Sequence, residues 1–322
     1  MDKDIKVSVI VLAYNHEKYL PQALDSIISQ KTEHRFEILI NDDASTDGTA
    51  LIAKDYADRY PDIIRFFRQE NNLGGTRSGY EMLIRCRGEY IASCEGDDYW
   101  CDDYKLQKQI EFLDTHPDYS GCAHDMIIVD ENGVPTKNQH LRWISRKRDY
   151  SAKDFKGIFL PGHPNSIMRR NLFLNPDYDG SIFYKAHRNI GDRTNALIWS
   201  VHGKIYRMPD HMGCYRCVRK KDGANLTSQL YVNSTDKLRD DFRYTMTLEQ
   251  YAADTLKCPD ISFEYHKSEL FVSAVFDAAR KRCDADLPRE ILNSCQHKAL
   301  CVLNAPVLIM KKAFEKLLGK NR

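Results

Sequence analysis

The segment that most constrains the fold is Val7–Ala13, with the sequence Val-Ser-Val-Ile-Val-Leu-Ala. A nearly continuous apolar run of this length is typical of a β-strand that is buried on both faces of a sheet. Such strands occur mainly in parallel sheets that are covered by helices on both sides. The run stops at Tyr14-Asn15-His16, where polar side chains begin. The segment therefore predicts an α/β protein with a polar edge at the end of its first strand.

Strand-like and helix-like segments then alternate along the chain. Further strands are predicted at residues 36–40, 63–67 and 90–94, and helices at residues 17–30, 49–60, 78–86 and 103–116. Strands that alternate with helices indicate right-handed crossovers and a mainly parallel sheet flanked by helices. We therefore expect a Rossmann-like α/β fold.

Polar and acidic residues follow three of these strands, as Tyr14-Asn15, Asp42-Asp43 and Glu95-Gly96-Asp97-Asp98. In open α/β sheets, ligands bind in the crevice beyond the carboxyl ends of the strands. Carboxylates gathered at such an edge repel one another unless a cation lies between them, and oxygen ligands of this kind suit Mg²⁺ or Mn²⁺. The alternative is a polar loop in which one acid caps the next helix. The candidates for that cap are Asp97, Asp98, Asp102 and Asp103.

Several classes of protein are disfavoured by what the sequence lacks. No Gly-x-Gly-x-x-Gly follows the first strand, and there is no Gly-x-x-x-x-Gly-Lys-Ser/Thr loop, so dinucleotide oxidoreductases and P-loop NTPases do not fit. The 47 basic and 46 acidic residues give a net charge of +1, which argues against nucleic acid as a partner. The acids at the start of the chain, which do not suit a signal peptide, the scattered cysteines and the lack of a spanning apolar run lead us to expect a cytoplasmic protein.

Four motifs together resemble the inverting glycosyltransferases of family 2, which have the GT-A fold. They are Val-Ser-Val-Ile-Val-Leu-Ala-Tyr-Asn (7–15), Ile-Leu-Ile-Asn-Asp-Asp-Ala-Ser-Thr-Asp-Gly-Thr (38–49), Asn-Leu-Gly-Gly (72–75) and Glu-Gly-Asp-Asp-Tyr-Trp (95–100). The resemblance is close over residues 5–130 and looser to about residue 230. It implies a catalytic domain at residues 1–232, which leaves a helical extension at residues 233–322.

The resemblance implies a nucleotide site at the ends of the first two strands. Asp43 would accept a hydrogen bond from a base N–H, and Arg77 would approach the phosphates unless it is simply solvated. The residues expected to contact the nucleotide are Leu12, Ala13, Tyr14, Asn15, Asp43, Arg77 and Asp97.

The resemblance also implies a metal site for Mn²⁺ or Mg²⁺. The Asp-x-Asp motif of the family stands here as Glu95-x-Asp97, followed by Asp98. All three are candidate ligands, and the sequence leaves open whether Asp97 or Asp98 is the direct one. Glu95 departs from the usual first Asp, and its longer side chain could reach the ion through a water.

An inverting transfer also needs a base that takes the proton of the attacking hydroxyl. Ile190-Gly191-Asp192 precedes an apolar helical segment that contains Leu197, Ile198 and Trp199. In the family the base usually lies within an acidic pair, and here Gly191 replaces the first acid, which leaves Asp192 as the candidate. The alternative role for Asp192 is an ordinary helix N-cap. By the same resemblance, His163 and Ser166 would lie on the acceptor side, although His163 could equally be an ordinary loop histidine.

Gln139-His-Leu-Arg142-Trp143 matches the Gln-x-x-Arg-Trp pattern of processive polysaccharide synthases. In those enzymes the motif follows the base, whereas here it precedes Asp192. We therefore interpret the match as chance and expect the transfer of a single sugar.

Residues 235–256 and 263–281 are predicted to be helical, and the last stretch combines an apolar face with several lysines. This basic amphipathic end could contact the inner membrane surface or pack on the catalytic domain, and the pattern fits both.

The sequence thus predicts a metal-dependent inverting glycosyltransferase of surface-polysaccharide synthesis. It would move one sugar from a nucleotide-diphosphate sugar, expected to be a UDP-sugar, to a glycan or lipid-linked acceptor. A nucleotidyltransferase is one alternative, but it should carry a glycine-rich loop after the first strand, and residues 12–18 contain no glycine. A non-catalytic relative that binds nucleotide sugars is the other.

Overall fold

The structure is a computed structural model that describes residues 5–217, 237–299 and 301–302. It divides into two compact units, residues 1–154 with 159–220, and residues 155–158 with 221–322. The domain boundary predicted at residue 232 lies outside the described residues, so it stays a prediction.

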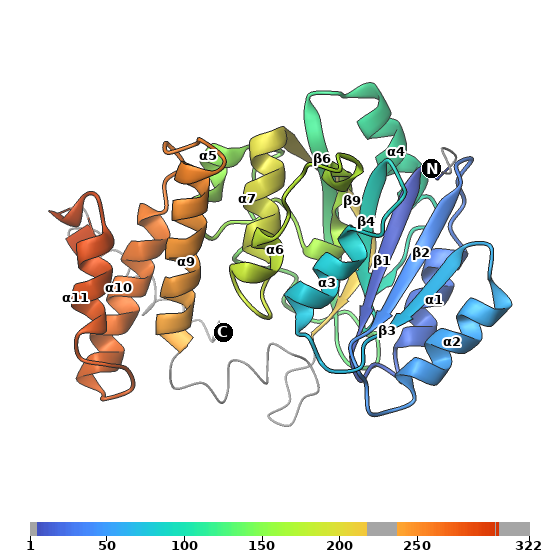
Figure 1. Ribbon diagram of the computed structural model, residues 1–322, viewed down its shortest axis with the longest axis horizontal. Coiled ribbons are helices and arrows are strands. Elements are labelled where there is room, and N and C mark those ends of the chain that lie inside the picture. Colours follow the sequence, from blue (N-terminus) through green and yellow to red (C-terminus); the bar gives the residue numbers. More distant parts are fainter. Residues whose placement is uncertain (1–4, 218–236, 300, 303–322) are drawn as a thin grey trace. The chain divides into compact units, whose positions relative to one another are not determined.

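The first unit is built on a nine-stranded sheet with the order β3-β2-β1-β4-β8-β6-β9-β5, and β7 pairs with β9 (Figure 1). The strands are β1 (Val7–Ala13), β2 (Phe36–Asp42), β3 (Ile64–Arg68), β4 (Tyr90–Glu95), β5 (Tyr99–Trp100), β6 (Tyr119–Val129), β7 (Asp149–Tyr150), β8 (Met168–Arg170) and β9 (Lys204–Arg216). Strands β1 to β4 are mutually parallel, as are β6 and β9, whereas β5, β7 and β8 are antiparallel to their neighbours. The predicted α/β fold with a mainly parallel sheet is confirmed.

Helices cover both faces of this sheet. Val7, Val9 and Val11 pack in one core with α1, α2 and α4, while α3, α6 and α7 lie over the other face (Figure 1). The helices are α1 (Leu20–Ile28), α2 (Thr49–Arg59), α3 (Gly75–Leu83), α4 (Lys105–Thr115), α5 (Ala152–Phe155), α6 (Ile182–Lys185) and α7 (Asp192–His202), with the 3₁₀ helices η1 (Pro164–Ser166) and η2 (Leu172–Leu174). Burial from both sides explains why β1 is apolar at almost every position.

Two local predictions differ from the structure. Helix α3 begins at Gly75 rather than at residue 78, directly after Gly74, whose φ of 86° cannot belong to a helix. The alternative interpretation, in which Asp97, Asp98, Asp102 or Asp103 caps the helix after β5, is wrong, because Tyr104 occupies the N-cap of α4.

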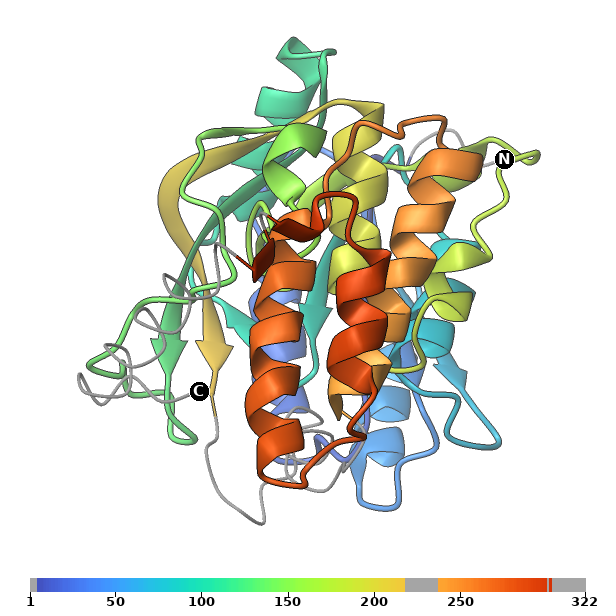
Figure 2. The ribbon, with the colours of Figure 1, turned by 90° about the vertical axis from the view of Figure 1, so that its left-hand side faces the viewer.

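Over residues 237–299, the second unit forms three helices that run side by side (Figure 2). They are α9 (Lys237–Asp254), α10 (Glu264–Ala279) and α11 (Leu287–Ser294). Leu270 and Ala274 of α10 pack on Leu287 and Ile291 of α11. Helices α9 and α10 match the prediction, and α11 was not predicted. The basic amphipathic end lies outside the described residues. Among the helices that the structure describes, none is long and apolar enough to cross a membrane.

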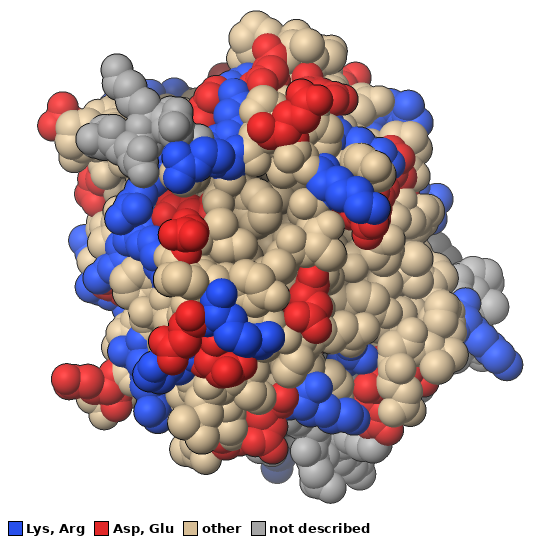
Figure 3. All heavy atoms as spheres, turned by 90° about the vertical axis from the view of Figure 1, so that its right-hand side faces the viewer, with Lys and Arg blue, Asp and Glu red and all other residues tan. Residues whose placement is uncertain are grey.

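Basic and acidic side chains are interspersed on the face of the molecule shown in Figure 3. Helix α2 carries exposed ion pairs four residues apart, Lys54 with Asp58 and Arg59 with Asp55. Pairs of this kind contribute little to stability.

Candidate active site

Strands β1, β2 and β4 end together at one edge of the sheet, toward the bottom of Figure 1. In register, Ala13 lies beside Asp42 and Leu12 beside Glu95. The carbonyl oxygens of Ala13 and Leu12 accept hydrogen bonds from the N–H groups of Asp43 (3.0 Å) and Gly96 (2.9 Å). The polar segments that follow the three strands therefore meet at this edge, as the sequence predicts.

Asn15 joins the loops that follow β1 and β2. Its backbone is left-handed, with a φ of 57°, a conformation that asparagine tolerates. Its N–H donates to Ser45 Oγ at 2.9 Å, and its Oδ1 accepts from Thr46 N–H at 2.9 Å. The side chain of Asn15 thus supports the loops, and the nucleotide contacts of Tyr14 and Asn15 stay predictions.

Asp43 holds the Asn-Leu-Gly-Gly segment. Its two carboxylate oxygens accept from Leu73 N–H at 2.8 Å and Gly74 N–H at 3.0 Å. Burial raises the pKa of Asp43 more than these hydrogen bonds lower it. Each oxygen keeps a further lone pair, so a contact with a nucleobase is still chemically open.

The same segment is attached to the loop that precedes α7. The hydroxyl of Thr76 lies 2.6 Å from the carbonyl oxygens of both His187 and Arg188, and its N–H donates to Arg188 at 3.2 Å. A Cβ on Gly74 would approach Asn189 Oδ1 to 2.8 Å, so only glycine fits beside this loop.

Asp192 is the first residue of α7 and is half-buried. Burial raises its pKa to about 6. No residue in the described part of the chain is seen to donate a hydrogen bond to its carboxylate. Because Gly191 occupies the N-cap position, the alternative that Asp192 is an N-cap is wrong.

Glu95 lies close enough to Asp97 and Asp192 for their charges to interact. Solvent reaches Glu95, but the surrounding protein atoms and then the like charges of Asp97 and Asp192 raise its pKa to about 8. Loops from distant parts of the sequence thus bring the predicted base and the predicted metal ligands together.

Asp98 differs from its neighbour Asp97. Asp98 is buried, and its two oxygens accept hydrogen bonds from Arg216 N–H at 2.7 Å and from the side-chain amide of Asn165. Burial, with the charges of Asp97 and Glu95, holds its pKa well above the usual range. The carboxylate of Asp97 instead faces His16 Nε2 at 3.9 Å.

Two of these carboxylates fit a divalent cation. Among the described residues, no three Cys, His, Asp or Glu side chains converge on one metal position. Glu95 and Asp97 nevertheless repel each other, and carboxylates in this arrangement suit an ion that takes its other ligands from phosphate oxygens and water. Asp98 is less open, because each of its oxygens already accepts one hydrogen bond from a protein group; each keeps a further lone pair, and its contact with the metal stays a prediction.

Comparison with known proteins gives the family. Residues 8–175 match the model of the family described as Glycosyl transferase family 2. The chain belongs to this family.

Three relatives of this glycosyltransferase are informative. It is 40% identical over 134 residues to the putative glycosyltransferase EpsE of Bacillus subtilis, a match that covers 42% of this chain and 48% of EpsE. It is 35% identical over 219 residues to the uncharacterized protein Rv1520 of Mycobacterium tuberculosis, a match that covers 65% of this chain and 58% of Rv1520. The chain thus spans about half of each relative. The structure of Staphylococcus aureus TarS residues 1–349 with UDP superposes with a TM-score of 0.55 at 18% identity, over 96% of this chain and 87% of that one. This match confirms the GT-A fold.

Two residues that support the acidic site of this glycosyltransferase were missed by the sequence analysis. The buried side chain of Asn165 accepts from Glu95 N–H at 3.2 Å and donates to Glu95 Oε2 at 3.4 Å. The buried guanidinium of Arg216 donates to the carbonyl oxygen of Asp97 at 2.8 Å and to Gln22 at 2.7 Å. Neither lies in a motif that could have identified it.

The remaining predicted residues have other partners in this structure. Arg77 pairs with Glu81 at 2.7 Å and lies 4.2 Å from the ring of Tyr184. Ser166 is fully buried, and its hydroxyl donates to the carbonyl oxygen of His163 at 2.7 Å. His163 is also buried. The geometry gives no support to the phosphate contact of Arg77 or the acceptor contact of Ser166, and both stay predictions.

Proposed function

We propose that this family 2 glycosyltransferase is metal-dependent and inverting, and that it transfers one sugar from a UDP-sugar to a hydroxyl of a glycan or lipid-linked acceptor. The observation that carries the proposal is that Asp97 and Asp192 both lie close enough to Glu95, at the carboxyl edge of the sheet, for their charges to act on it. A base beside a diphosphate site is what an inverting transfer requires.

In the proposed reaction, the carboxylate of Asp192 accepts the proton of the acceptor hydroxyl. The hydroxyl oxygen forms a bond to the anomeric carbon from the face opposite the diphosphate. The bond between that carbon and the diphosphate oxygen breaks, and its electron pair leaves with the diphosphate. With a pKa of about 6, Asp192 is mostly ionised at neutral pH and can serve as this base.

Glu95 and Asp97 would hold a Mn²⁺ or Mg²⁺ ion, which when bound would neutralise charge on the diphosphate. Asp98 would support Glu95 and Asp97 indirectly, through its hydrogen bonds with Arg216 and Asn165. The loops that follow β1 and β2, with Asp43, would receive the nucleoside.

The relative TarS supports the choice of donor and acceptor. One structure of TarS contains UDP and another contains UDP-GlcNAc. TarS itself is named a poly(ribitol-phosphate) beta-N-acetylglucosaminyltransferase, and it is 31% identical to this chain over 134 residues, 40% of this chain and 22% of TarS. These names support a UDP-sugar and a surface glycan, and we place the enzyme at the cytoplasmic side of the cell envelope.

A single transfer is favoured over processive synthesis. The side chain of Gln139 accepts from Ile128 N–H at 2.8 Å and donates to its carbonyl oxygen at 2.9 Å, so the first residue of the Gln-x-x-Arg-Trp match holds a loop to β6. This role explains the glutamine without a polymer channel.

The proposal is tested with the full chain, Mn²⁺ and a panel of nucleotide sugars. We expect release of UDP from at least one UDP-sugar, an EDTA-sensitive rate, and a product whose anomeric configuration, read by NMR, is opposite to that of the donor. Asp192→Asn should bind UDP but not turn over. Binding of a donor without any turnover by the unmodified chain would instead support the non-catalytic alternative.

A further inference from the structure

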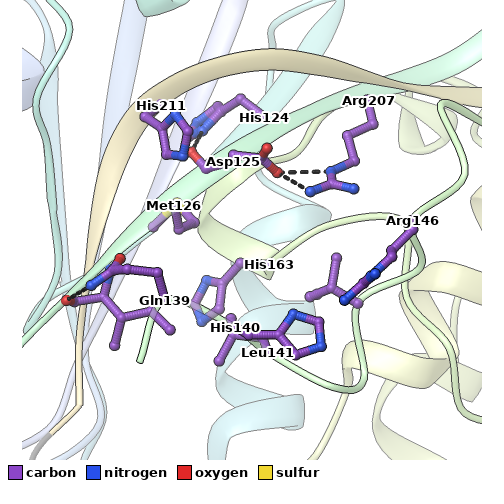
Figure 4. A pocket seen from close by; sticks show the side chains of 12 residues that line it. His124, Asp125, Met126, Gln139, His140, Leu141, Arg146, His163, Arg207 and His211 are labelled. Atoms are coloured by element: carbon purple, nitrogen blue, oxygen red, sulfur yellow. Dashed lines mark hydrogen bonds and ion pairs between the residues drawn. The ribbon is translucent and has the colours of Figure 1, made fainter. Parts of the chain in front are cut away.

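A cavity of about 120 Å³ lies between β6, β9 and the loop of residues 139–146, within the first unit (Figure 4). Its walls include His163, together with Arg207 and His211 of β9 and four residues of β6, which are His124, Asp125, Met126 and Ile128. One water needs only about 15 Å³ of such space, so a group of several heavy atoms fits here.

The loop that closes this cavity is firmly held. Besides the two hydrogen bonds of Gln139 to Ile128, Leu160 N–H donates to the carbonyl oxygen of Trp143, and Ser145 N–H donates to that of Leu160, both at 2.8 Å. The cavity is therefore pre-formed by backbone contacts on both sides of the loop.

The cavity has an excess of positive charge. Arg207 donates to Asp125 Oδ1 at 2.7 Å, which neutralises that guanidinium. Arg146 is exposed, no carboxylate in the described part of the chain is seen to pair with it, and its guanidinium extends toward His140 (Figure 4). Lys147 and Arg148 follow directly and are also exposed. An anion beside Arg146 would gain a charge-assisted interaction.

The cavity shares a wall with the acidic site. The centroid of the His163 ring lies 4.4 Å from that of Tyr215 and 5.7 Å from that of Trp143. Its Nδ1 accepts from the N–H of Asn165 at 3.3 Å, and the side-chain amide of Asn165 binds Asp98. A group bound in the cavity would thus lie beside the acidic site without entering it.

We propose that this cavity binds an anionic group of the acceptor, a phosphate or a carboxylate, while the acidic edge holds the donor. The inference rests on the proposed function, because it takes the second substrate of a sugar transfer as the occupant. The carboxylates of the acidic edge repel an anionic acceptor, whereas Arg146 and the two cations that follow it attract one. The charge of each site therefore determines which substrate it binds, the acceptor in the cavity and the donor, with its metal ion, at the acidic edge.

The test uses the full chain, labelled with ¹³C in its histidine rings and kept in EDTA, so that no metal draws an anion to the acidic edge. Inorganic phosphate and, separately, D-glucuronate are titrated while the ring resonances of His140, His163 and His211 are followed by NMR. We expect saturable shifts with at least one probe, and the responding probe tells phosphate from carboxylate recognition. Arg146→Ala should weaken this binding about tenfold. Arg59→Ala, which removes an ion-paired arginine of α2 that does not line the cavity, should leave it unchanged.

The proposal is overturned if neither probe shifts these resonances, if Arg146→Ala binds as tightly as the unmodified chain, or if UDP with Mg²⁺ displaces the probe. Loss of sugar transfer from every donor would count against the proposed function alone, because these titrations need no turnover.

Discussion

The acids at the carboxyl edge of the sheet fall into two groups that differ in their partners. Asp43 and Asp98 each accept two hydrogen bonds from protein groups, and they hold loops in place. Asp97 and Asp192 lack such donors within the described residues, and they lie beside Glu95, whose pKa they raise. An aspartate at this edge thus has a structural role where protein groups donate hydrogen bonds to it. Where they do not, its carboxylate is free to bind a metal ion or accept a proton.

The largest effect should come from the acid that lacks donors and begins α7. Asp192→Asn keeps the size of the side chain but removes its ability to take a proton, so kcat for transfer should fall roughly 10²- to 10⁴-fold. Initial rates of UDP release with an acceptor measure this fall, and calorimetry should show unchanged UDP binding. A variant that kept its kcat would place the base elsewhere.

Asp97→Ala should act on the metal. Loss of one of the two carboxylates proposed to hold the ion, Glu95 and Asp97, should raise the Mn²⁺ concentration for half-maximal activity at least about tenfold. The measurement is a Mn²⁺ titration of the initial rate at saturating donor. If Asp98→Ala shifted this titration more than Asp97→Ala, the division into open and supported acids would be wrong.

The pH dependence should report Asp192. Its pKa of about 6 lies above the ordinary value, so the proton-accepting form is present above pH 6 and is lost as the pH falls through it. At saturating metal, kcat/KM should therefore fall about tenfold per unit below pH 6. Far-UV circular dichroism over the same range controls for unfolding. An activity that stayed constant down to pH 4 would exclude a base with this pKa.

A smaller effect, on the free energy of unfolding, should distinguish the acids that accept hydrogen bonds, such as Asp43, from those that do not, such as Asp97. Asp43→Ala leaves the N–H groups of Leu73 and Gly74 without their acceptor, and the free energy of unfolding should drop by about 1–3 kcal/mol. Asp97→Ala is the matched control, since no described residue is seen to donate a hydrogen bond to its carboxylate, which lies 3.9 Å from His16 Nε2. Urea unfolding of both variants measures the difference, and equal losses would remove the basis of the comparison.

The smallest effect is expected for Arg77→Ala. The exposed pair of Arg77 with Glu81 contributes about 0.3–0.5 kcal/mol, so stability should scarcely change. Because the guanidinium of Arg77 also lies over the ring of Tyr184, we expect it not to contact UDP, and UDP affinity should change little. A fall of about tenfold in UDP affinity, measured by calorimetry, would instead support the predicted contact of Arg77 with the phosphates.

The sheet edge could be predicted because each acidic segment directly follows its own strand. The apolar runs fix the strands, parallel pairing aligns their ends, and the residues that come next in sequence must lie there. Asp192 was found only through the resemblance to family 2, since nothing local separates it from a helix cap. The start of α3 was missed because it depends on Gly74 and on a distant loop.

The supports of the acidic site could not be predicted. Asp98 meets Asn165 across 67 positions of sequence and Arg216 across 118. Such contacts depend on how β9 and η1 fold back toward β4, which no periodicity encodes. The cavity beside His163 was missed for the same reason, although the exposed basic run at residues 146–148 was visible.

The hydrogen bonds of Thr76 limit how the loop that precedes α7 can be redesigned. One hydroxyl and one backbone N–H fasten the segment that Asp43 supports to the loop that carries Asp192 toward the edge. An engineer who exchanged residues 187–191 for those of another enzyme, in order to alter substrate choice, would have to keep the backbone path that presents the carbonyl oxygens of His187 and Arg188 to Thr76.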